Sequence, residues 1–301
     1  MTEQHFARNC FLRPSPADVV TSSVMASISV LILTLNEEVN LSECLDFCAW
    51  SDDIVVFDSF STDRTPQIAA RPGVRFFQRH FDNYAGQRNA ALADVQYRHP
   101  WVLMVDADER TPADLVAEMT QAVAQADPDT VMFRMRRKDF FLGRWLRRSS
   151  GYPSWFGRLV RLGRVRIERE VNEEYIADGK IGQLKAHLLH FPFNRGIDYW
   201  YERHNRYSSM EAIAKVETHK LPLGLTSLFK RDPVDRRRVL KRLVYRMPWR
   251  PSIWFIYLYF FRLGFLDGRA GLAFSRMRAS YEMIIDLKVL ELERRRSGAP
   301  L

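Results

Sequence analysis

Two aspartates stand one residue apart, Asp106 and Asp108, directly after the apolar run Trp101–Val105. The pair Thr111-Pro112 follows, and a proline in this place is typical of the first turn of a helix. Two carboxylates at the end of a strand suit a hard divalent cation, which takes oxygen ligands and leaves positions for diphosphate oxygens. The structural alternative is that one aspartate only caps the following helix. A second Asp-x-Asp, at 127–129, lies in an expected loop, so the strand context makes the first pair the candidate site.

Asp58 and Asp63 flank another expected strand end. Asp58 is the last residue of the strand expected over 53–58, and ligand binding is the better explanation for a carboxylate at that position. Asp63 lies shortly before Pro66, so capping of a helix explains this aspartate equally well.

The chain around these aspartates alternates short apolar strands with helical segments, which predicts a doubly wound, mostly parallel α/β sheet. Ligands in such sheets bind beyond the carboxyl ends of the strands, where the acidic segments fall. The sequence contains neither Gly-x-Gly-x-x-Gly nor Gly-x-x-x-x-Gly-Lys-Ser/Thr, which excludes Rossmann and P-loop nucleotide sites. Short runs between 151 and 196 predict a small antiparallel extension. The expected strands are 28–33, 53–58, 74–78, 101–106 and 130–134, and the expected helices are 40–50, 65–71, 86–95 and 112–126.

The composition is that of a folded protein: 47% of the 301 residues are hydrophobic and 27% are charged, which excludes disordered, collagen-like and coiled-coil classes. Three cysteines cannot build a disulfide framework, so a reducing cytosol is expected. We expect a disordered leader, or a start assigned too early, over 1–25. A catalytic domain is expected over 26–195, and a helical, basic and aromatic extension over 196–301.

The net charge of +9 is concentrated in patches. Residues 230–250 hold nine lysines and arginines against two aspartates, and a second basic cluster lies at 134–148. The nine apolar or aromatic residues Ile253–Phe261 are too few to span a membrane. Separate basic and aromatic blocks favour an anionic membrane surface, bound through 230–262, over nucleic acid, whose sites interleave the two. A helix buried against the catalytic domain is the third interpretation.

Four motifs follow one another along the first part of the chain: Leu33-Thr34-Leu35-Asn36-Glu37-Glu38, Asp58-Ser59-Phe60-Ser61-Thr62-Asp63-Arg64-Thr65, Gly86-Gln87-Arg88-Asn89-Ala90-Ala91-Leu92 and Val105-Asp106-Ala107-Asp108-Glu109. In this order they closely resemble the nucleotide-sugar-binding half of family 2 inverting glycosyltransferases with the GT-A fold. Segments 203–208 and 264–268 are similar to the branch related to lipopolysaccharide-core β-1,4-glucosyltransferases.

The resemblance implies a role for each matching residue. Asn36 and Glu37 would line the nucleotide site, and Asp58 would contact the uracil or ribose. Gln87 and Arg88 would lie beside the sugar diphosphate. Asp106 and Asp108 would engage the donor and a metal ion, Mg²⁺ or Mn²⁺. The residue types alone also point to Asp58, Asp106 and Asp108, but not to the other four.

Inverting transfer needs a base, because the acceptor hydroxyl must lose its proton as it attacks the anomeric carbon. The branch in question has a Val-His-Glu motif after the Asp-x-Asp, and this sequence has Val171-Asn172-Glu173-Glu174 in its place. We predict Glu173 as the base and keep Glu174 as the alternative; an exposed acidic loop is the structural explanation. His190 is a candidate metal ligand, although a histidine in an apolar strand is more often a core residue.

The sequence thus predicts a metal-dependent inverting glycosyltransferase that moves a hexose from a nucleotide diphosphate sugar, with UDP as the expected nucleotide. The expected acceptor is a glycan or a lipid-linked molecule in the assembly of lipopolysaccharide or another cell-envelope polysaccharide. The expected location is cytoplasmic, peripheral on the cytoplasmic face of the membrane. The alternatives are sugar transfer to polyprenyl phosphate and, in a different class, a basic nucleic-acid-binding protein without catalysis; a nucleic acid partner is not expected.

Overall fold

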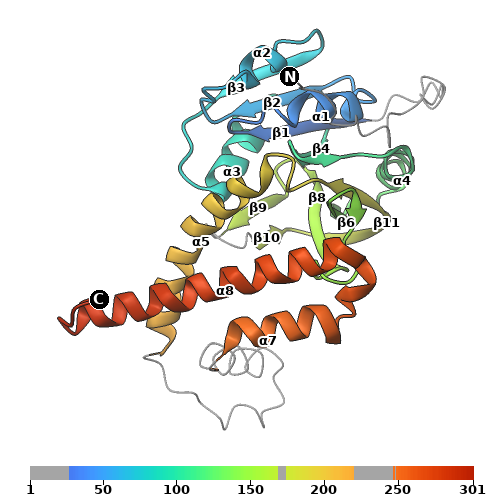
Figure 1. The fold of residues 1–301 in the computed structure, drawn as a ribbon. Helices are drawn as coiled ribbons and strands as arrows, with labels where there is room; N and C mark the ends of the chain where they lie inside the picture. The colour runs from blue at the N-terminus through green and yellow to red at the C-terminus, as the bar shows by residue number, and fades with distance from the viewer. Residues whose placement is uncertain (1–26, 169–173, 220–246, 248) are drawn as a thin grey trace, which may run out of the picture. The chain divides into compact units, whose positions relative to one another are not determined.

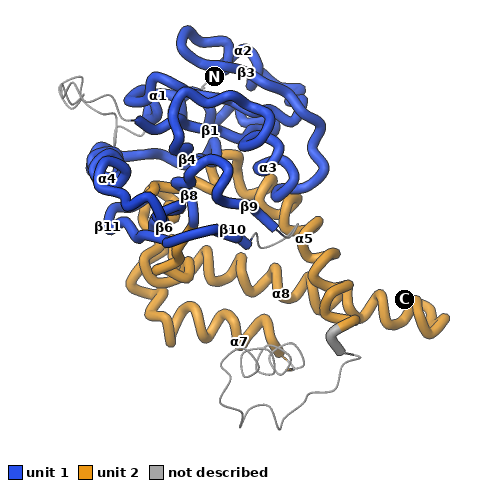
Figure 2. Tube along the Cα trace, turned by 180° about the vertical axis from the view of Figure 1, so that it is seen from behind, with its two compact units in different colours: residues 1–135, 157–187 blue, residues 136–156, 188–301 orange. Residues whose placement is uncertain are grey.

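The computed structural model describes residues 27–168, 174–219, 247 and 249–301. The chain divides into two compact units, each drawn in its own colour in Figure 2. Unit 1 comprises residues up to 135 together with 157–187, and unit 2 comprises 136–156 together with 188–301. Unit 2 therefore takes in residues 136–156, which the sequence analysis places inside the catalytic region.

Unit 1 is built on parallel strands, of which the central ones are buried along nearly their whole length. The strand order is β3-β2-β1-β4, and the three pairings between these strands are parallel. Aliphatic side chains on both faces explain the near-continuous apolar runs, because helices cover both faces of such a sheet. The strands are β1 (Ile28–Thr34), β2 (Ile54–Asp58), β3 (Val74–Gln78) and β4 (Trp101–Asp106).

The register aligns the carboxyl ends of three strands. Thr34 of β1 lies opposite Asp58 of β2, and Leu33 lies opposite Asp106 of β4. The segments that follow these strands therefore leave the sheet at the same edge. Crossover helices connect the strands (Figure 1): α1 (Leu41–Cys48), α2 (Thr65–Ala69) and α3 (Tyr84–Asp94), with α4 (Ala113–Ala124) after β4.

Beyond β4 the sheet continues in the order β8-β6-β11-β5, with β7 paired to β6. Strand β8 runs antiparallel to β4, and β7 runs antiparallel to β6. A separate two-stranded antiparallel sheet joins β9 to β10. The predicted α/β class, with its small antiparallel extension, is thus confirmed. These strands are β5 (Glu109–Arg110), β6 (Thr130–Phe141), β7 (Arg144–Trp145), β8 (Trp155–Arg161), β9 (Val165–Glu168), β10 (Glu174–Ala177) and β11 (Lys180–His190).

Unit 2 is mainly helical, as predicted for the C-terminal region. Its core lies between α5 (Gly196–His219) and α8 (Gly268–Arg296), where Trp200 and Val216 are buried in one cluster with Tyr281 and Ile285. The shorter helix α7 (Arg250–Ile256) also packs on α8. A π-helical turn, η3 (Tyr257–Phe261), and a 3₁₀ turn, η4 (Gly264–Asp267), connect α7 to α8.

The apolar run Ile253–Phe261 forms the end of α7 and all of η3. Leu258 is the only buried residue of this run, and Phe260 and Phe261 are 54% and 77% exposed. The interpretation of this run as a helix buried against the catalytic domain is therefore wrong, because most of its side chains are exposed or only partly buried. Among the described residues no helix is both long and apolar enough to cross a membrane. The basic segment 230–250 lies almost entirely outside the described residues.

Candidate active site

Two loops at the carboxyl edge of unit 1 are joined by hydrogen bonds between backbone and side chains. The backbone N–H of Asn36 donates to Ser61 Oγ at 2.7 Å, and Asn36 Oδ1 accepts from the Thr62 N–H at 2.8 Å. The N–H of Glu37 donates to Thr65 Oγ1 at 2.7 Å. Asn36 has a positive φ of 56°, a conformation that asparagine tolerates better than most residues. The loops after β1 and β2 therefore form one platform that includes Asn36 and Glu37, and their contact with a nucleotide stays a prediction.

Asp58 is fully buried beneath this platform. Its Oδ1 accepts hydrogen bonds from the hydroxyls of Thr34 and Ser61, and its Oδ2 accepts from the Ser61 N–H at 2.8 Å and from Gln78 Nε2 at 3.1 Å. A carboxylate has about four lone-pair sites, so these four bonds fill its acceptor capacity. Asp58 holds the platform in place, and its contact with uracil or ribose stays a prediction.

Helix α3 carries the next two predicted residues. It begins where the Asn83 side chain accepts a hydrogen bond from the Gly86 N–H at 2.7 Å, which caps the first turn. Gln87 and Arg88 are both buried. Gln87 Nε2 donates to Ser59 Oγ at 3.1 Å, which connects α3 to the loop after β2.

Two buried arginines form ion pairs with Asp106. Arg88 Nη2 lies 2.8 Å from Asp106 Oδ1, and Arg158 Nη2 contacts Asp106 Oδ2. Arg158 also lies 2.9 Å from Glu109 Oε1, and Glu109 Oε2 accepts the Asp106 N–H at 3.0 Å. Glu109 is completely buried, whereas the Asp106 side chain is 31% exposed. Two carboxylates and two guanidinium groups thus form a charge-balanced cluster with one open face.

The two arginines set the protonation of Asp106. Burial alone would raise the pKa of this carboxyl, but the positive charges of Arg158 and Arg88 outweigh burial and hold the pKa well below its usual range. Asp106 is therefore an anion at physiological pH. The same two carboxylates raise the pKa of Arg158, against the effect of its burial.

Asp108 is half-buried two residues farther on. In the described part of the chain no group of three or more His, Cys, Asp or Glu side chains could by itself hold a metal ion. Both oxygens of Asp106 pair with arginines, and metal binding by Asp106 and Asp108 stays a prediction. A site with one protein carboxylate suits Mg²⁺, which commonly completes its shell with substrate phosphates and water.

Of the remaining predicted residues, the structure describes His190 and Glu174. His190 belongs to unit 2, and its Nδ1 lies 2.7 Å from Asp139 Oδ1. A carboxylate thus pairs with one of the two ring nitrogens, and ligation of a metal by His190 stays a prediction. Glu174 is exposed at the start of β10, and Glu173 lies outside the described residues.

Sequence reasoning missed three residues of the site: Glu109, Arg158 and Asn89. Arg158 lies in the buried stretch of β8, and a single arginine inside an apolar strand is a signal that a buried carboxylate must face it. Asn89 of α3 exchanges two hydrogen bonds with the backbone of Ile167 on β9. No sequence pattern connects these two, because the contact joins positions 78 residues apart.

Comparison with known proteins adds independent information. The model of the glycosyl transferase family 2 matches residues 29–197. The lipopolysaccharide core biosynthesis glycosyltransferase LpsC of Rhizobium meliloti is 28% identical over 84% of this chain and 90% of its own length. An uncharacterized glycosyltransferase of Rickettsia typhi is 31% identical over 35% of this chain and 36% of its own length. The match to the structure of residues 1–349 of S. aureus TarS with UDP-GlcNAc covers 90% of this chain and 92% of that fragment, at 15% identity and a TM-score of 0.42.

The family match covers all four motifs, three at strand ends and one in α3, and it extends through β8 to Arg158. It spans more than half of the chain, and so this protein belongs to glycosyl transferase family 2 and is a glycosyltransferase.

Proposed function

We propose that the protein transfers a hexose, with inversion, from a nucleoside diphosphate sugar to a glycan or lipid-linked acceptor in lipopolysaccharide core assembly. The similarity to LpsC, which is named for lipopolysaccharide core biosynthesis, supports the acceptor class. UDP is the nucleotide that we propose.

The cluster around Asp106 carries this proposal. Arg88 and Arg158 fix an anionic carboxylate at the strand edge, beside the platform formed by the loops after β1 and β2. A carboxylate in this position can accept hydrogen bonds from donor hydroxyls, and the platform offers backbone and side-chain groups to the nucleotide. Fixed groups of this kind need no reorganisation when the donor binds.

We assign the metal position to Asp108. Mg²⁺ or Mn²⁺ held there would neutralise negative charge on the departing nucleoside diphosphate. Asp106 then acts as a positioning residue for the donor. The pairing of His190 Nδ1 with Asp139 is compatible with a metal-binding histidine, so His190 stays a candidate ligand.

The proton of the acceptor hydroxyl goes to Glu173 in our proposal, with Glu174 as the alternative. Glu174 begins strand β10 of the hairpin that Asn89 attaches to α3 through β9. The hairpin thus connects Glu174 to the helix that carries Arg88.

Thermal unfolding with UDP, with and without Mn²⁺, tests the donor and metal assignments. A ligand that binds only the folded protein stabilises it by about 2.7 kcal/mol at a hundredfold excess over Kd. We expect a Mn²⁺-dependent rise in Tm that Asp108→Asn abolishes. Asp129→Asn is the matched control, because it alters the second Asp-x-Asp, which is exposed. Absence of a rise with UDP, GDP or dTDP would contradict the proposal.

We further propose that the enzyme is peripheral on the cytoplasmic face of the membrane, with the α7–η3–η4 segment against the anionic surface. Large apolar side chains in this segment are exposed, among them Trp249 at 80% and Phe261 at 77%. Aromatic side chains with adjacent basic residues suit the membrane interface. Cosedimentation with anionic vesicles should weaken in Phe260→Ser/Phe261→Ser, but not in Leu287→Ser, which alters an exposed leucine of α8. Equal binding by all three proteins would refute this placement.

A further inference from the structure

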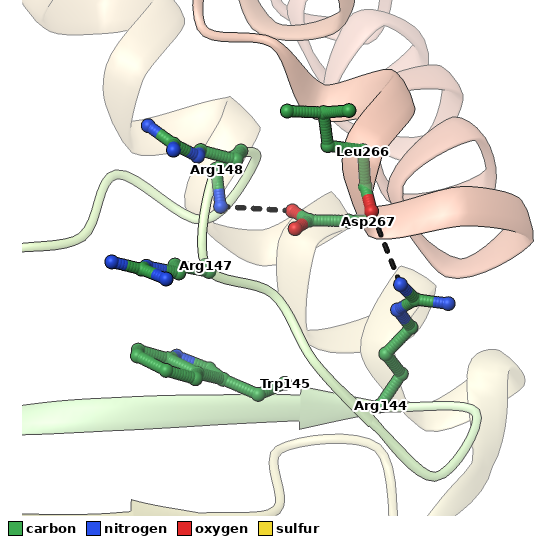
Figure 3. A pocket seen from close by; sticks show the side chains of 6 residues that line it. All are labelled: Arg144, Trp145, Arg147, Arg148, Leu266 and Asp267. Carbon is green, nitrogen blue, oxygen red and sulfur yellow. Dashed lines mark hydrogen bonds between the residues drawn. The ribbon is translucent and has the colours of Figure 1, made fainter.

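Unit 2 contains a pocket of about 380 Å³ that the donor site does not use. Its lining residues are Arg144, Trp145, Arg147, Arg148, Leu266 and Asp267, all within unit 2 (Figure 3). Three of the six are arginines, from the basic cluster at 134–148.

The lining contains one carboxylate, that of Asp267, and it accepts hydrogen bonds from uncharged groups. Asp267 Oδ2 accepts hydrogen bonds from the N–H groups of Arg148 and Ser149, each at 2.9 Å, and from Ser149 Oγ at 2.8 Å. Asp267 is 3% exposed. Within the described part of the chain, the Arg144, Arg147 and Arg148 guanidinium groups form no ion pair with a carboxylate. The pocket therefore keeps an excess of positive charge.

The loop that carries the arginines is fixed by a buried side chain and by hydrogen bonds. Leu146 is fully buried in the core of unit 2, between the exposed Arg144 and Arg147. Arg262 Nη2 donates to the Tyr152 carbonyl at 2.6 Å, which secures the other end of the loop. Arg144 Nη2 donates to the Leu266 carbonyl at 3.2 Å. The loop that presents the arginines is thus attached to η4 at several points. Because the loop is already ordered, it loses little conformational entropy when a ligand binds.

The motif at 264–268 explains part of this arrangement. A Cβ on Gly264 would collide with the Leu258 carbonyl, so the turn η4 can pack closely only with glycine there. Gly268 has a φ of +64°, in the region that favours glycine. The two glycines place Asp267 where it can fix the Arg148–Ser149 backbone. The motif therefore builds the floor of the pocket.

The walls combine cations with apolar surface. The Arg147 guanidinium lies over the Trp145 ring, 5.6 Å from its centroid, and Lys138 Nζ lies 5.0 Å from the same centroid. Figure 3 shows the side chains of Arg148, Arg147 and Trp145 extending to the same side of the loop. Leu266 adds a half-exposed apolar edge. Guanidinium groups match phosphate oxygens in geometry and charge, and an indole beside them suits an organic group bonded to the phosphate.

We propose that this pocket binds a phosphate ester, as a second anionic site separate from the donor site. That this phosphate ester belongs to the acceptor, as a phosphorylated sugar or a lipid phosphate, rests on the proposed function. The proposal that the pocket binds phosphate does not depend on that function.

Isothermal titration with inorganic phosphate and with glucose 6-phosphate, on the full chain with UDP and Mn²⁺ present, tests this site. We expect Arg147→Gln/Arg148→Gln to weaken binding at least about tenfold, because each change removes a charge-assisted contact. Arg276→Gln is the matched control, since Arg276 is an exposed arginine of α8 outside the pocket. Arg147→Glu alone is the second variant, for the case that the double variant does not fold.

Vesicles of phosphatidic acid in phosphatidylcholine, against phosphatidylcholine alone, separate the two sources of phosphate. If the protein binds glucose 6-phosphate and the pocket variants weaken this binding, the ligand is a phosphorylated sugar. If the protein binds only phosphatidic acid and the same variants weaken that binding, the ligand is a lipid phosphate. Absence of binding to every probe, or binding that Arg147→Gln/Arg148→Gln leaves unchanged, overturns the proposal. The rise in Tm with UDP is recorded for each variant, so that a failure of the donor assignment is recognised separately.

Discussion

Asn89 and Ile167 exchange two hydrogen bonds: Asn89 Nδ2 donates to the Ile167 carbonyl at 2.7 Å, and the Ile167 N–H donates to Asn89 Oδ1 at 3.0 Å. The side chain of α3 thus acts as an additional strand partner for β9. Since Arg88 is the neighbouring residue, one turn of helix supports both the Asp106 cluster and the β9–β10 hairpin.

Replacement of Asn89 by alanine should loosen the hairpin. The change leaves two backbone groups of Ile167 without their partner, and each lost bond costs about 1 kcal/mol. We expect a loss of about 1–2 kcal/mol in the free energy of unfolding, measured in urea, and a fall in kcat larger than any change in donor KM. Gln121→Ala, an exposed amide of α4, serves as the control. An unchanged kcat would show that the hairpin does not position the base.

Arg158 should be the most sensitive residue of the site for stability. Arg158→Met leaves Glu109, which is completely buried, without its cation, and breaking a buried ion pair costs about 3–5 kcal/mol. Urea unfolding measures this cost. Arg166→Gln is the matched control: it removes an exposed pair with Glu168, which is worth about 0–1 kcal/mol. Similar losses in the two variants would contradict the proposed importance of burial.

Asp106 should make stability depend on pH in the acidic range. The folded pKa lies below the unfolded value of about 3.9, so the stabilisation is present above that value and is lost as pH falls through the folded pKa. We expect the difference in unfolding free energy between wild type and Asp106→Asn to shrink as pH falls below about 4. A difference that stays constant down to the acid limit of folding would argue against the two arginines as the cause.

The base assignment predicts a loss of rate without a loss of donor binding. Removal of a general base costs about 10²–10⁴-fold in rate. Glu173→Gln should lower kcat in this range and leave the UDP-induced rise in Tm unchanged, with Glu174→Gln nearer to wild type. Glu168→Gln is the control, because Glu168 lies opposite Glu174 in the hairpin register. Transfer near the wild-type rate in Glu173→Gln would refute the assignment, and a large loss in Glu174→Gln instead would move it there.

His204 should be neutral throughout the physiological range. Burial lowers the pKa of His204 to about 4, and its ring stacks on Trp200 with centroids 3.6 Å apart. Because the folded pKa is below the unfolded value of about 6.5, stability is lost as pH falls from about 6.5 to about 4. NMR titration of the ring protons, assigned with His204→Gln, should give a midpoint near 4. A midpoint near 6.5 would show that the ring is open to solvent.

The sequence alone determined the local elements and the edge at which the site lies. The apolar runs of β1, β2 and β4 each end in polar residues, and the order of these motifs was enough to indicate the family. Local periodicity and strand-end chemistry are properties of neighbouring residues, so they can be read along the chain. Asn36, Glu37, Gln87 and Arg88 were found only through the resemblance.

Only the tertiary structure decided which charges meet. Arg158 reaches Asp106 across 52 positions, and Asn89 reaches Ile167 across 78. Tertiary packing also filled the acceptor capacity of Asp58 and paired His190 with Asp139. It enclosed the arginines at 144–148 in a pocket whose floor comes from η4, more than 100 residues later. Contacts between distant segments depend on how whole elements pack, and no spacing along the chain encodes them.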